Sequence, residues 1–407
     1  MTCFVNKTRD ILYNSACNKQ FYQGKQSMAT RNENKAVVDT HNRMSMNELE
    51  EIIRTNCQLI IENPGIAMTI PPILIHSSPG VGKSSIVRQV AEKLGIGFVD
   101  VRLAEMESVD IRGLPSVDKD LGVMKWNAPD FWPRDPKSKG IIFLDEITSC
   151  DKSCQVAAYE LILDRKIGDF YKVPDGWYIV SAGNLTTDRA VAMSMSSALS
   201  NRFLHVELEA DPEQWCKWAM THDVHPSVTG FIQYRPENLF NMEKENLERG
   251  WPSPRSWDRV SQMCKIYGNN EQLLRKITYG LVGPAKGVEF MEFHRLNKSF
   301  DNILDMLYGK TPIKIPEKND QLYAMCSSLI YILWRGKDEK DEKQRLDGFF
   351  KILCEMRPEF VMMCINGAMH GRSEELAGIS AKKLFNHPLY RKCLDRYKNL
   401  ISKHTNI

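Results

Sequence analysis

The chain has 407 residues, of which 43% are hydrophobic, 26% charged and 9% aromatic. These shares match ordinary water-soluble globular proteins, so they exclude a fibrous protein, a wholly disordered chain and a small disulfide-stapled fold. At roughly 150 residues per domain, the length predicts two to three domains. The formal net charge of +3 is too small to indicate a surface dedicated to nucleic-acid phosphates, although it is compatible with a local basic face.

The cysteines and the apolar stretches predict the compartment. The 11 cysteines are an odd number without a pair of C-x-x-C motifs, which fits a reducing compartment better than a disulfide framework. The two nearest in sequence, Cys150 and Cys154, are more typical of packed thiols on a helix than of a zinc pair. Apolar stretches are far shorter than a membrane span, and the N-terminus has no apolar signal-peptide core. We therefore expect a cytoplasmic protein without a membrane contact.

Residues 1–44 are rich in Asn, Lys, Gln, Ser and Thr and show no sustained hydrophobic period. This composition predicts a flexible N-terminal tail. Its basic bias leaves an organelle-targeting sequence as an alternative, and Met28, Met44 and Met46 are alternative start sites.

Residues 45–210 alternate between helical and strand patterns. Ser45, with Glu48 three residues later, forms the capping pattern of a helix. Short apolar runs between helical stretches are typical of strands buried on both faces, which predicts an α/β domain with a doubly wound parallel sheet. The expected strands are 73–76, 98–103, 141–145, 177–182 and 203–208, and the expected helices include 86–94 and 153–163.

Strand patterns stop after Asp211, and helical patterns take over. The sequence therefore predicts an all-helical domain over residues 211–290 and a helical C-terminal region over residues 291–407. Loop signals interrupt the first of these at 250–254 and 283–287. The charge run at 337–343 predicts a solvated loop.

The segment Ser77-Ser78-Pro79-Gly80-Val81-Gly82-Lys83-Ser84 lies between an expected strand and an expected helix, which is the setting of a phosphate-binding loop, or P-loop. Gly80 and Gly82 let backbone N–H groups turn around phosphate oxygens. Lys83 is predicted to bridge the outer phosphates and Ser84 to ligate Mg²⁺. The usual first glycine is replaced by Ser77, which requires a compatible backbone there. The residues expected to hold ATP are Pro79, Gly80, Val81, Gly82, Lys83, Ser84 and Ser85.

A second element is the apolar run 140–144, which is followed by Asp145 and Glu146. Asp145 is placed to hold Mg²⁺, and Glu146 is placed to polarise a water for attack on the γ-phosphate. Alone, such a pair is often only the solvated end of a strand. Together with the upstream P-loop, it predicts ATP hydrolysis.

With these motifs the chain resembles the AAA+ ATPases, and within that superfamily it is similar to the MoxR-type group over about residues 45–290. The resemblance implies that Asn184, at the end of an expected strand, senses the γ-phosphate; an Asn that caps the next helix is the alternative. It also implies that Arg202 is an arginine finger serving a neighbouring subunit's nucleotide. Arg189 is the rival for that role, and a surface salt bridge is the alternative for either arginine.

The resemblance further implies that the helical domain forms a lid over the nucleotide. Arg255, directly after Pro254 at the start of an expected helix, resembles the family's second sensor, which reaches the nucleotide of its own subunit. A buried structural arginine is the alternative.

Two segments favour the MoxR-type assignment over a general AAA+ one. Segments 110–133 and 167–174 resemble the hairpins that this group inserts into its core. The aromatic side chains of Trp126, Phe131 and Trp132 could grip a client polypeptide, and packing against their own domain is at least as compatible with the sequence.

The resemblance implies a Mg²⁺-dependent ATPase that assembles into a homo-oligomeric ring of six, because Arg202 is useful only beside another subunit's ATP. The implied output is remodelling or activation of a client protein, with a partner that carries a von Willebrand factor A-type domain. One alternative is a nucleic-acid-dependent motor or loader, against which the near-neutral charge argues. The other is an ATP-binding switch without turnover, against which the set of intact motifs argues.

His222 and His225 lie near Cys216 and could suggest a further metal site. Because neither a carboxylate nor another ligand follows at a recognisable spacing, we expect ordinary helix-end residues there. The metal ligands that the sequence predicts are therefore Ser84 and Asp145.

Overall fold

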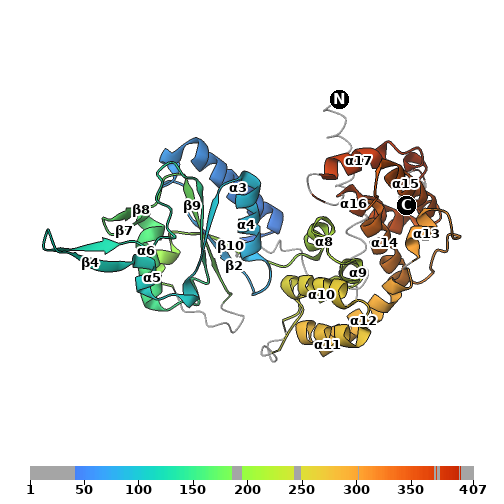
Figure 1. The fold of residues 1–407 in the computed structure, drawn as a ribbon, viewed down its shortest axis with the longest axis horizontal. Coiled ribbons are helices and arrows are strands. Elements are labelled where there is room, and N and C mark those ends of the chain that lie inside the picture. The colour runs from blue at the N-terminus through green and yellow to red at the C-terminus, as the bar shows by residue number, and fades with distance from the viewer. Residues whose placement is uncertain are drawn as a thin grey trace, which may run out of the picture. The chain divides into compact units, whose positions relative to one another are not determined.

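The structure is a computed structural model that describes residues 42–185, 195–242, 249–300, 302–370, 373, 376–393 and 395. A parallel sheet with its covering helices comes first in the chain, and helices follow (Figure 1). The predicted tail lies outside the described residues except for its last three, so its flexibility stays a prediction. The division into four parts at residues 44, 210 and 290 also stays a prediction.

Six parallel strands form the sheet, in the order β1-β10-β2-β9-β6-β3. Five of them are the predicted strands, with ends that agree within one residue. The sixth, β1, lies in the segment that the sequence assigns to the tail and pairs with β10 at the edge of the sheet. The strands are β1 (Arg43–Met44), β2 (Ile73–His76), β3 (Gly97–Arg102), β6 (Gly140–Asp145), β9 (Trp177–Gly183) and β10 (Leu204–Leu208).

Helices cover both faces of this sheet, which confirms the doubly wound α/β prediction (Figure 1). Successive side chains of a strand point to opposite faces. Ile73 and Ile75 of β2 therefore join the core under α3 and α4, while Leu74 joins the core under α5 and α6. The helical segments here are α3 (Met46–Glu62), η1 (Pro64–Ile66), α4 (Lys83–Leu94), η2 (Leu103–Glu105), α5 (Ser108–Arg112) and α6 (Lys152–Asp164).

Helix α3 begins as its sequence predicts. The Ser45 hydroxyl accepts the N–H of Glu48, and the Glu48 carboxylate accepts the N–H of Ser45. This reciprocal cap satisfies backbone donors that have no partner within a helix. The buried face of α3, with Leu49 and Ile53, packs into the core of the sheet.

Two antiparallel hairpins lie at the positions where the resemblance implies inserts. Strands β4 (Leu114–Asp118) and β5 (Val123–Asn127) form the first, which projects away from the sheet (Figure 1). Strands β7 (Lys166–Ile167) and β8 (Tyr171–Lys172) form the second.

The three aromatic residues of the first insert differ in their surroundings. Trp126 is 46% exposed and stacks on Phe170 of the second hairpin. Trp132 is only 1% exposed and donates its indole N–H to the carbonyl of Ile111, and Phe131 packs beside it. Packing within the domain thus accounts for Trp132 and Phe131, while Trp126 remains accessible.

Beyond β10, the described residues contain helices and no strands, as predicted. Two apolar cores lie within this region, one among α8 to α12 together with Ala324 of α14, and one among α13 to α17. The helices are α7 (Ser197–Ser200, before β10), α8 (Pro212–Thr221), α9 (Pro226–Tyr234), η4 (Pro236–Asn238), α10 (Pro254–Tyr267), α11 (Glu271–Val282), α12 (Pro284–Lys298), α13 (Ile303–Leu307), α14 (Asn319–Leu333), α15 (Glu339–Leu353), α16 (Pro358–Met369) and α17 (Ala377–Phe385).

Two loop predictions in this region are wrong. The charge run at 337–343 is mostly the first turn of α15, because the Asp338 carboxylate accepts the N–H of Asp341 and caps the helix. Its acidic residues also interact favourably with the positive end of the helix. The signal at 283–287 contains only one loop residue, Gly283, since Pro284 begins α12.

Both cysteines of the nearest pair are buried and unbonded to each other. Cys150 donates its thiol to the carbonyl of Ile147, and Cys154 donates to that of Met106. Within the described ranges, every helix is too short or too polar to cross a bilayer.

Candidate functional site

The predicted ATP-site residues lie at the carboxyl ends of three neighbouring strands. The P-loop follows β2, Asp145 ends β6, and Asn184 directly follows β9. Strand β9 pairs with both of the other two, and all three are parallel. Their carboxyl ends therefore meet at one edge of the sheet, which is where ligands bind in open α/β folds.

The P-loop uses its two glycines for left-handed backbone. Gly80 has φ +83° and Gly82 has φ +116°, conformations that side chains with a Cβ rarely adopt. Ser77 is not among the residues with positive φ; it is fully buried and its N–H donates to the carbonyl of Gly183. The backbone at position 77 is thus compatible with serine, and glycine is not required there.

Helix α4 begins directly at the end of the loop, at Lys83. Its N-cap is Gly82, which has no side chain to accept the first backbone N–H groups. The open N–H groups and the positive end of the helix dipole together make an anion site. Ser84 and Ser85 lie in this first turn, so their N–H groups and hydroxyls are at the same end of the helix.

Lys83 joins the P-loop to the end of β9. Its ammonium group donates to the carbonyl of Ser77 at 2.8 Å and to Oδ1 of Asn184 at 3.3 Å. The structure thus brings together the two residues that are predicted to contact the outer phosphates. The Asn184 side chain is directed at this lysine, and the segment 186–194, where the alternative of a helix cap would be judged, lies outside the described residues.

Asp145 and Glu146 form the acidic side of the site. Partial burial raises the pKa of Asp145, and the nearby Lys83 opposes this shift. A carboxylate that loses solvation in this way is stabilised by an added cation, as expected of a Mg²⁺ ligand. Glu146 is exposed, with φ +59°, and its N–H donates to Asp145. This uncommon conformation turns the chain directly after β6 and leaves the Glu146 carboxylate accessible.

The start of α10 contacts the P-loop. The N–H of Arg255 donates to the carbonyl of Gly80 at 3.1 Å, and a Cβ on Gly80 would lie 2.9 Å from the Ser253 hydroxyl. The Arg255 side chain is exposed, so the alternative of a buried structural arginine is wrong. The helical domain therefore contacts the predicted phosphate site through the turn that carries Arg255, whose role in binding ATP stays a prediction.

Arg202 lies at the opposite edge of the sheet from its own P-loop. It precedes β10, which pairs in parallel with β2 so that Leu204 is opposite Ile73. At about 3.3 Å per residue, the length of β2 alone separates Arg202 from the P-loop by roughly 10 Å. The side chain is exposed, and within the described residues its guanidinium has no hydrogen bond or ion pair. The rival Arg189 lies outside the described residues.

Three polar contacts at the site have no counterpart in the sequence predictions. Thr148 accepts the N–H of Asn184 through its hydroxyl, and Ser149 accepts from the Asn184 side chain. His76, directly before the P-loop, is 2.9 Å from a ring nitrogen of His205 on β10. Only the nearness of Thr148, Ser149 and His76 to the motifs along the chain could have indicated these contacts, because each contact joins segments that are far apart in the sequence.

The comparisons with known proteins agree with the strand-edge site. Residues 73–161, from β2 into α6, match the family described as "ATPase family associated with various cellular activities (AAA)". None of the curated proteins matches the chain.

Solved structures match over a larger share of the chain than the family model does, at low sequence identity and low TM-score. A putative ATPase from Cytophaga hutchinsonii is 13% identical, with 70% of this chain and 82% of that chain covered and a TM-score of 0.28. The RuvB Holliday junction branch migration motor of Thermotoga maritima is 16% identical, with 71% and 85% covered and a TM-score of 0.32. Similarity at this level carries no inference about activity. Residues 73–161 thus match an ATPase domain of the AAA family, and its P-loop and Asp145 lie at the carboxyl edge of the parallel sheet.

Proposed function

We propose that this protein is a Mg²⁺-dependent ATPase of the MoxR type, which works as a homo-oligomeric ring of six and remodels or activates a client protein. The observation that carries the proposal is the convergence of Lys83, Asn184 and Asp145 at one edge of the sheet, beside an uncapped helix start. These groups match the needs of phosphoryl transfer, which are positioning and charge stabilisation.

Each side chain at the edge then has a distinct task. Lys83 exchanges its bonds to loop carbonyls for the outer phosphates, and Asn184 orients the γ-phosphate region. The exposed Glu146 takes a proton from the attacking water. Ser84 and Asp145 offer the hard oxygen ligands that hold Mg²⁺, and the bound ion supplies charge neutralisation at the phosphates.

The position of Arg202 supports a shared active site. Since its own P-loop lies at the far edge of the sheet, this exposed guanidinium can serve ATP only in a neighbouring copy. A planar guanidinium there stabilises charge that develops on the γ-phosphate. Ring assembly follows from this division of the site between subunits.

The β4–β5 hairpin supports a client-binding role. Val117, Met124 and Trp126 share one face of the hairpin and are exposed, with exposed fractions of 67%, 66% and 46%. Clustered exposed apolar groups on a projecting hairpin are typical of protein-binding surfaces. The MoxR-type resemblance adds the class of partner, a protein with a von Willebrand factor A-type domain.

Steady-state ATP hydrolysis, with the particle mass read by light scattering in the same samples, tests the proposal. Glu146→Gln should lower turnover by roughly 10²–10⁴-fold and still assemble, because it removes only the general base. Arg202→Ala should lower turnover by about 10³-fold or more. The matched control Arg235→Ala, which removes an exposed arginine paired with Glu237, should change turnover less than twofold.

A mixing experiment tests whether the site is shared. Lys83→Ala and Arg202→Ala should each be inactive alone, and mixed rings should regain activity wherever an intact P-loop adjoins an intact Arg202. Failure of the mixture to recover, with a wild type that turns over as a monomer, would contradict the ring. Turnover that requires added DNA, with a steep salt dependence, would instead favour a nucleic-acid motor.

A further inference from the structure

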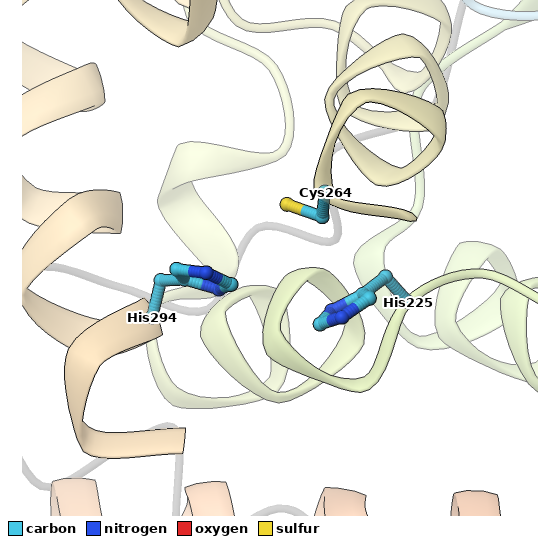
Figure 2. A group of neighbouring side chains, drawn as sticks. All are labelled: His225, Cys264 and His294. Carbon is cyan, nitrogen blue, oxygen red and sulfur yellow. The ribbon is translucent and has the colours of Figure 1, made fainter. Parts of the chain in front are cut away.

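Three potential metal ligands meet inside the helical domain, away from the P-loop. His225 is the N-cap of α9, Cys264 lies in α10, and His294 lies in α12. Their ligand atoms all lie within 4.8 Å of one another. Figure 2 shows the three side chains extending from three separate elements toward a common space. Of His222, His225 and Cys216, which lie near one another in the sequence, only His225 belongs to this cluster.

The hydrogen bonds around His294 determine which of its nitrogens carries the proton. Asn297 donates its amide to the carbonyl of Ala324, so its Oδ1 must be the acceptor for the Ser227 hydroxyl. Having donated its only proton, Ser227 can only accept from Nδ1 of His294, at 2.8 Å. The proton is therefore on Nδ1, and Nε2 of His294 presents a lone pair.

This lone pair has no hydrogen-bond partner. His294 is 1% exposed, and its Nε2 is buried without a donor among the described residues. Leaving a buried acceptor unsatisfied is costly, and such groups in native proteins call for an explanation such as a missing ion. A metal-binding histidine typically has this arrangement, with its other ring N–H held by a hydrogen bond.

We propose that His225, Cys264 and His294 bind a zinc-type transition-metal ion, with the fourth coordination position open to water. Two imidazoles and one thiolate are a donor set that suits Zn²⁺. The thiol of Cys264 is 3% exposed and becomes a thiolate when the ion binds.

The cluster needs a modest contraction to bind the ion. Ligand atoms on a tetrahedral Zn²⁺ are separated by about 3.3–3.6 Å, given bond lengths of roughly 2.0–2.3 Å, so the largest gap must close by about 1 Å. His225 must also reorient, because its Nδ1 now accepts the N–H of Ser227 at the start of α9. His294 and Cys264 are accordingly the principal ligands, and His225 completes the site.

A bound metal would link α9, α10 and α12 within the helical domain. Helix α10 carries Cys264 at its C-terminal half and contacts the P-loop at its first turn, through Arg255 and Gly80. A bound ion therefore stabilises the helix that connects the helical domain to the ATP site. This site lies outside the ATPase motifs and does not depend on the proposed function.

Cobalt binding provides the direct test. The full chain, stripped with a chelator and kept reduced, is titrated with Co²⁺, whose bond to a thiolate gives a charge-transfer band in the near ultraviolet. We expect one Co²⁺ per chain and displacement by Zn²⁺. Cys264→Ser should abolish the band, and Cys216→Ser, which changes a buried cysteine of the same core outside the cluster, should keep it.

A second variant covers the case in which Cys264→Ser fails to fold. His225→Asn retains a side chain that caps α9 and removes the imidazole, so it should fold and bind Co²⁺ at least tenfold more weakly. As an independent readout, Zn²⁺ should raise the melting temperature of wild type and Cys216→Ser but not of Cys264→Ser. Absence of the band in wild type, or its persistence in Cys264→Ser, would overturn the proposal, and in the second case the metal occupies another thiol.

Discussion

The predicted ATP site and the cluster of His225, Cys264 and His294 are two polar groupings that the chain assembles in different ways. The P-loop, Asp145 and Asn184 follow or end neighbouring strands, and parallel pairing brings those strand ends together, while Arg255 comes from the start of α10. The cluster instead takes one residue from each of three helices, His225, Cys264 and His294. A site at a sheet edge can therefore be recognised from local motifs, whereas a site between helices forms only when the helices pack together.

The two regions also have separate cores, and core substitutions give the largest expected effect. Phe143 of β6 and Phe290 of α12 are both fully buried, in different clusters. Phe143→Ala and Phe290→Ala should each cost about 3–5 kcal/mol in the free energy of unfolding, from lost apolar burial and a residual cavity. Hydrogen exchange should show reduced protection mainly in the mutated region. Equal loss in both regions would show that they unfold as one unit.

A substitution at the P-loop should affect chemistry rather than folding. Lys83→Ala removes a cation aimed at the phosphates and should lower ATP turnover on the order of 10²–10³-fold. The control Lys93→Ala lies on the same helix, where Lys93 pairs with Glu50 at the surface, and should change turnover less than twofold. If both variants lose activity equally, the damage is to α4 as a whole and the assigned role of Lys83 is wrong.

Acid should weaken the helical domain through His294. Burial lowers its pKa to about 4 from 6.5, so between these values the unfolded chain binds a proton that the folded chain does not. Stability is therefore complete above about pH 6.5 and falls as the pH drops toward 4, by roughly 2–3 kcal/mol for this residue.

Denaturant unfolding at a series of pH values, in the presence of a chelator, measures this loss. His294→Gln should reduce the slope between pH 6.5 and 4 by the share of one residue, because burial also lowers the pKa of His225 to about 3 and that of His76 to about 4. His222→Gln, an exposed control, should leave the slope unchanged. A slope that persists in full in His294→Gln would assign the acid sensitivity to other groups, such as His76, whose pKa burial also lowers to about 4.

The smallest expected effect concerns the contact between the helical domain and the P-loop. Gly80→Ala and Gly95→Ala both place a Cβ on a left-handed backbone, at a cost of about 1–2 kcal/mol each. Only at Gly80 would the Cβ approach Ser253, while at Gly95 it meets open space among the described residues. ATP affinity, measured by calorimetry, should fall several-fold in Gly80→Ala alone. If ATP affinity fell equally in the two variants, the loss would not come from the contact between position 80 and Ser253.

The amino-acid sequence alone predicts the α/β fold, the limits of five of the six strands in the described sheet, and the motifs that meet at one edge of it, but it assigns β1 to the tail. This was possible because the apolar runs, the glycines of the P-loop and the acids after β6 are contiguous in the chain, and parallel strands place their ends together by geometry. The cap of α3 by Ser45 and Glu48 was predictable for the same reason, since both partners lie within one turn.

Several other features depend on tertiary contacts and could not be predicted from the sequence. It placed Arg202 at the edge opposite its own P-loop and Gly80 against Ser253, and it separated the exposed Trp126 from the buried Trp132. It also brought His294 and Cys264 together, although neither has a neighbouring ligand in sequence. Such contacts depend on helix packing and strand order, which arise from many weak apolar contacts between distant segments and leave no local pattern in the chain.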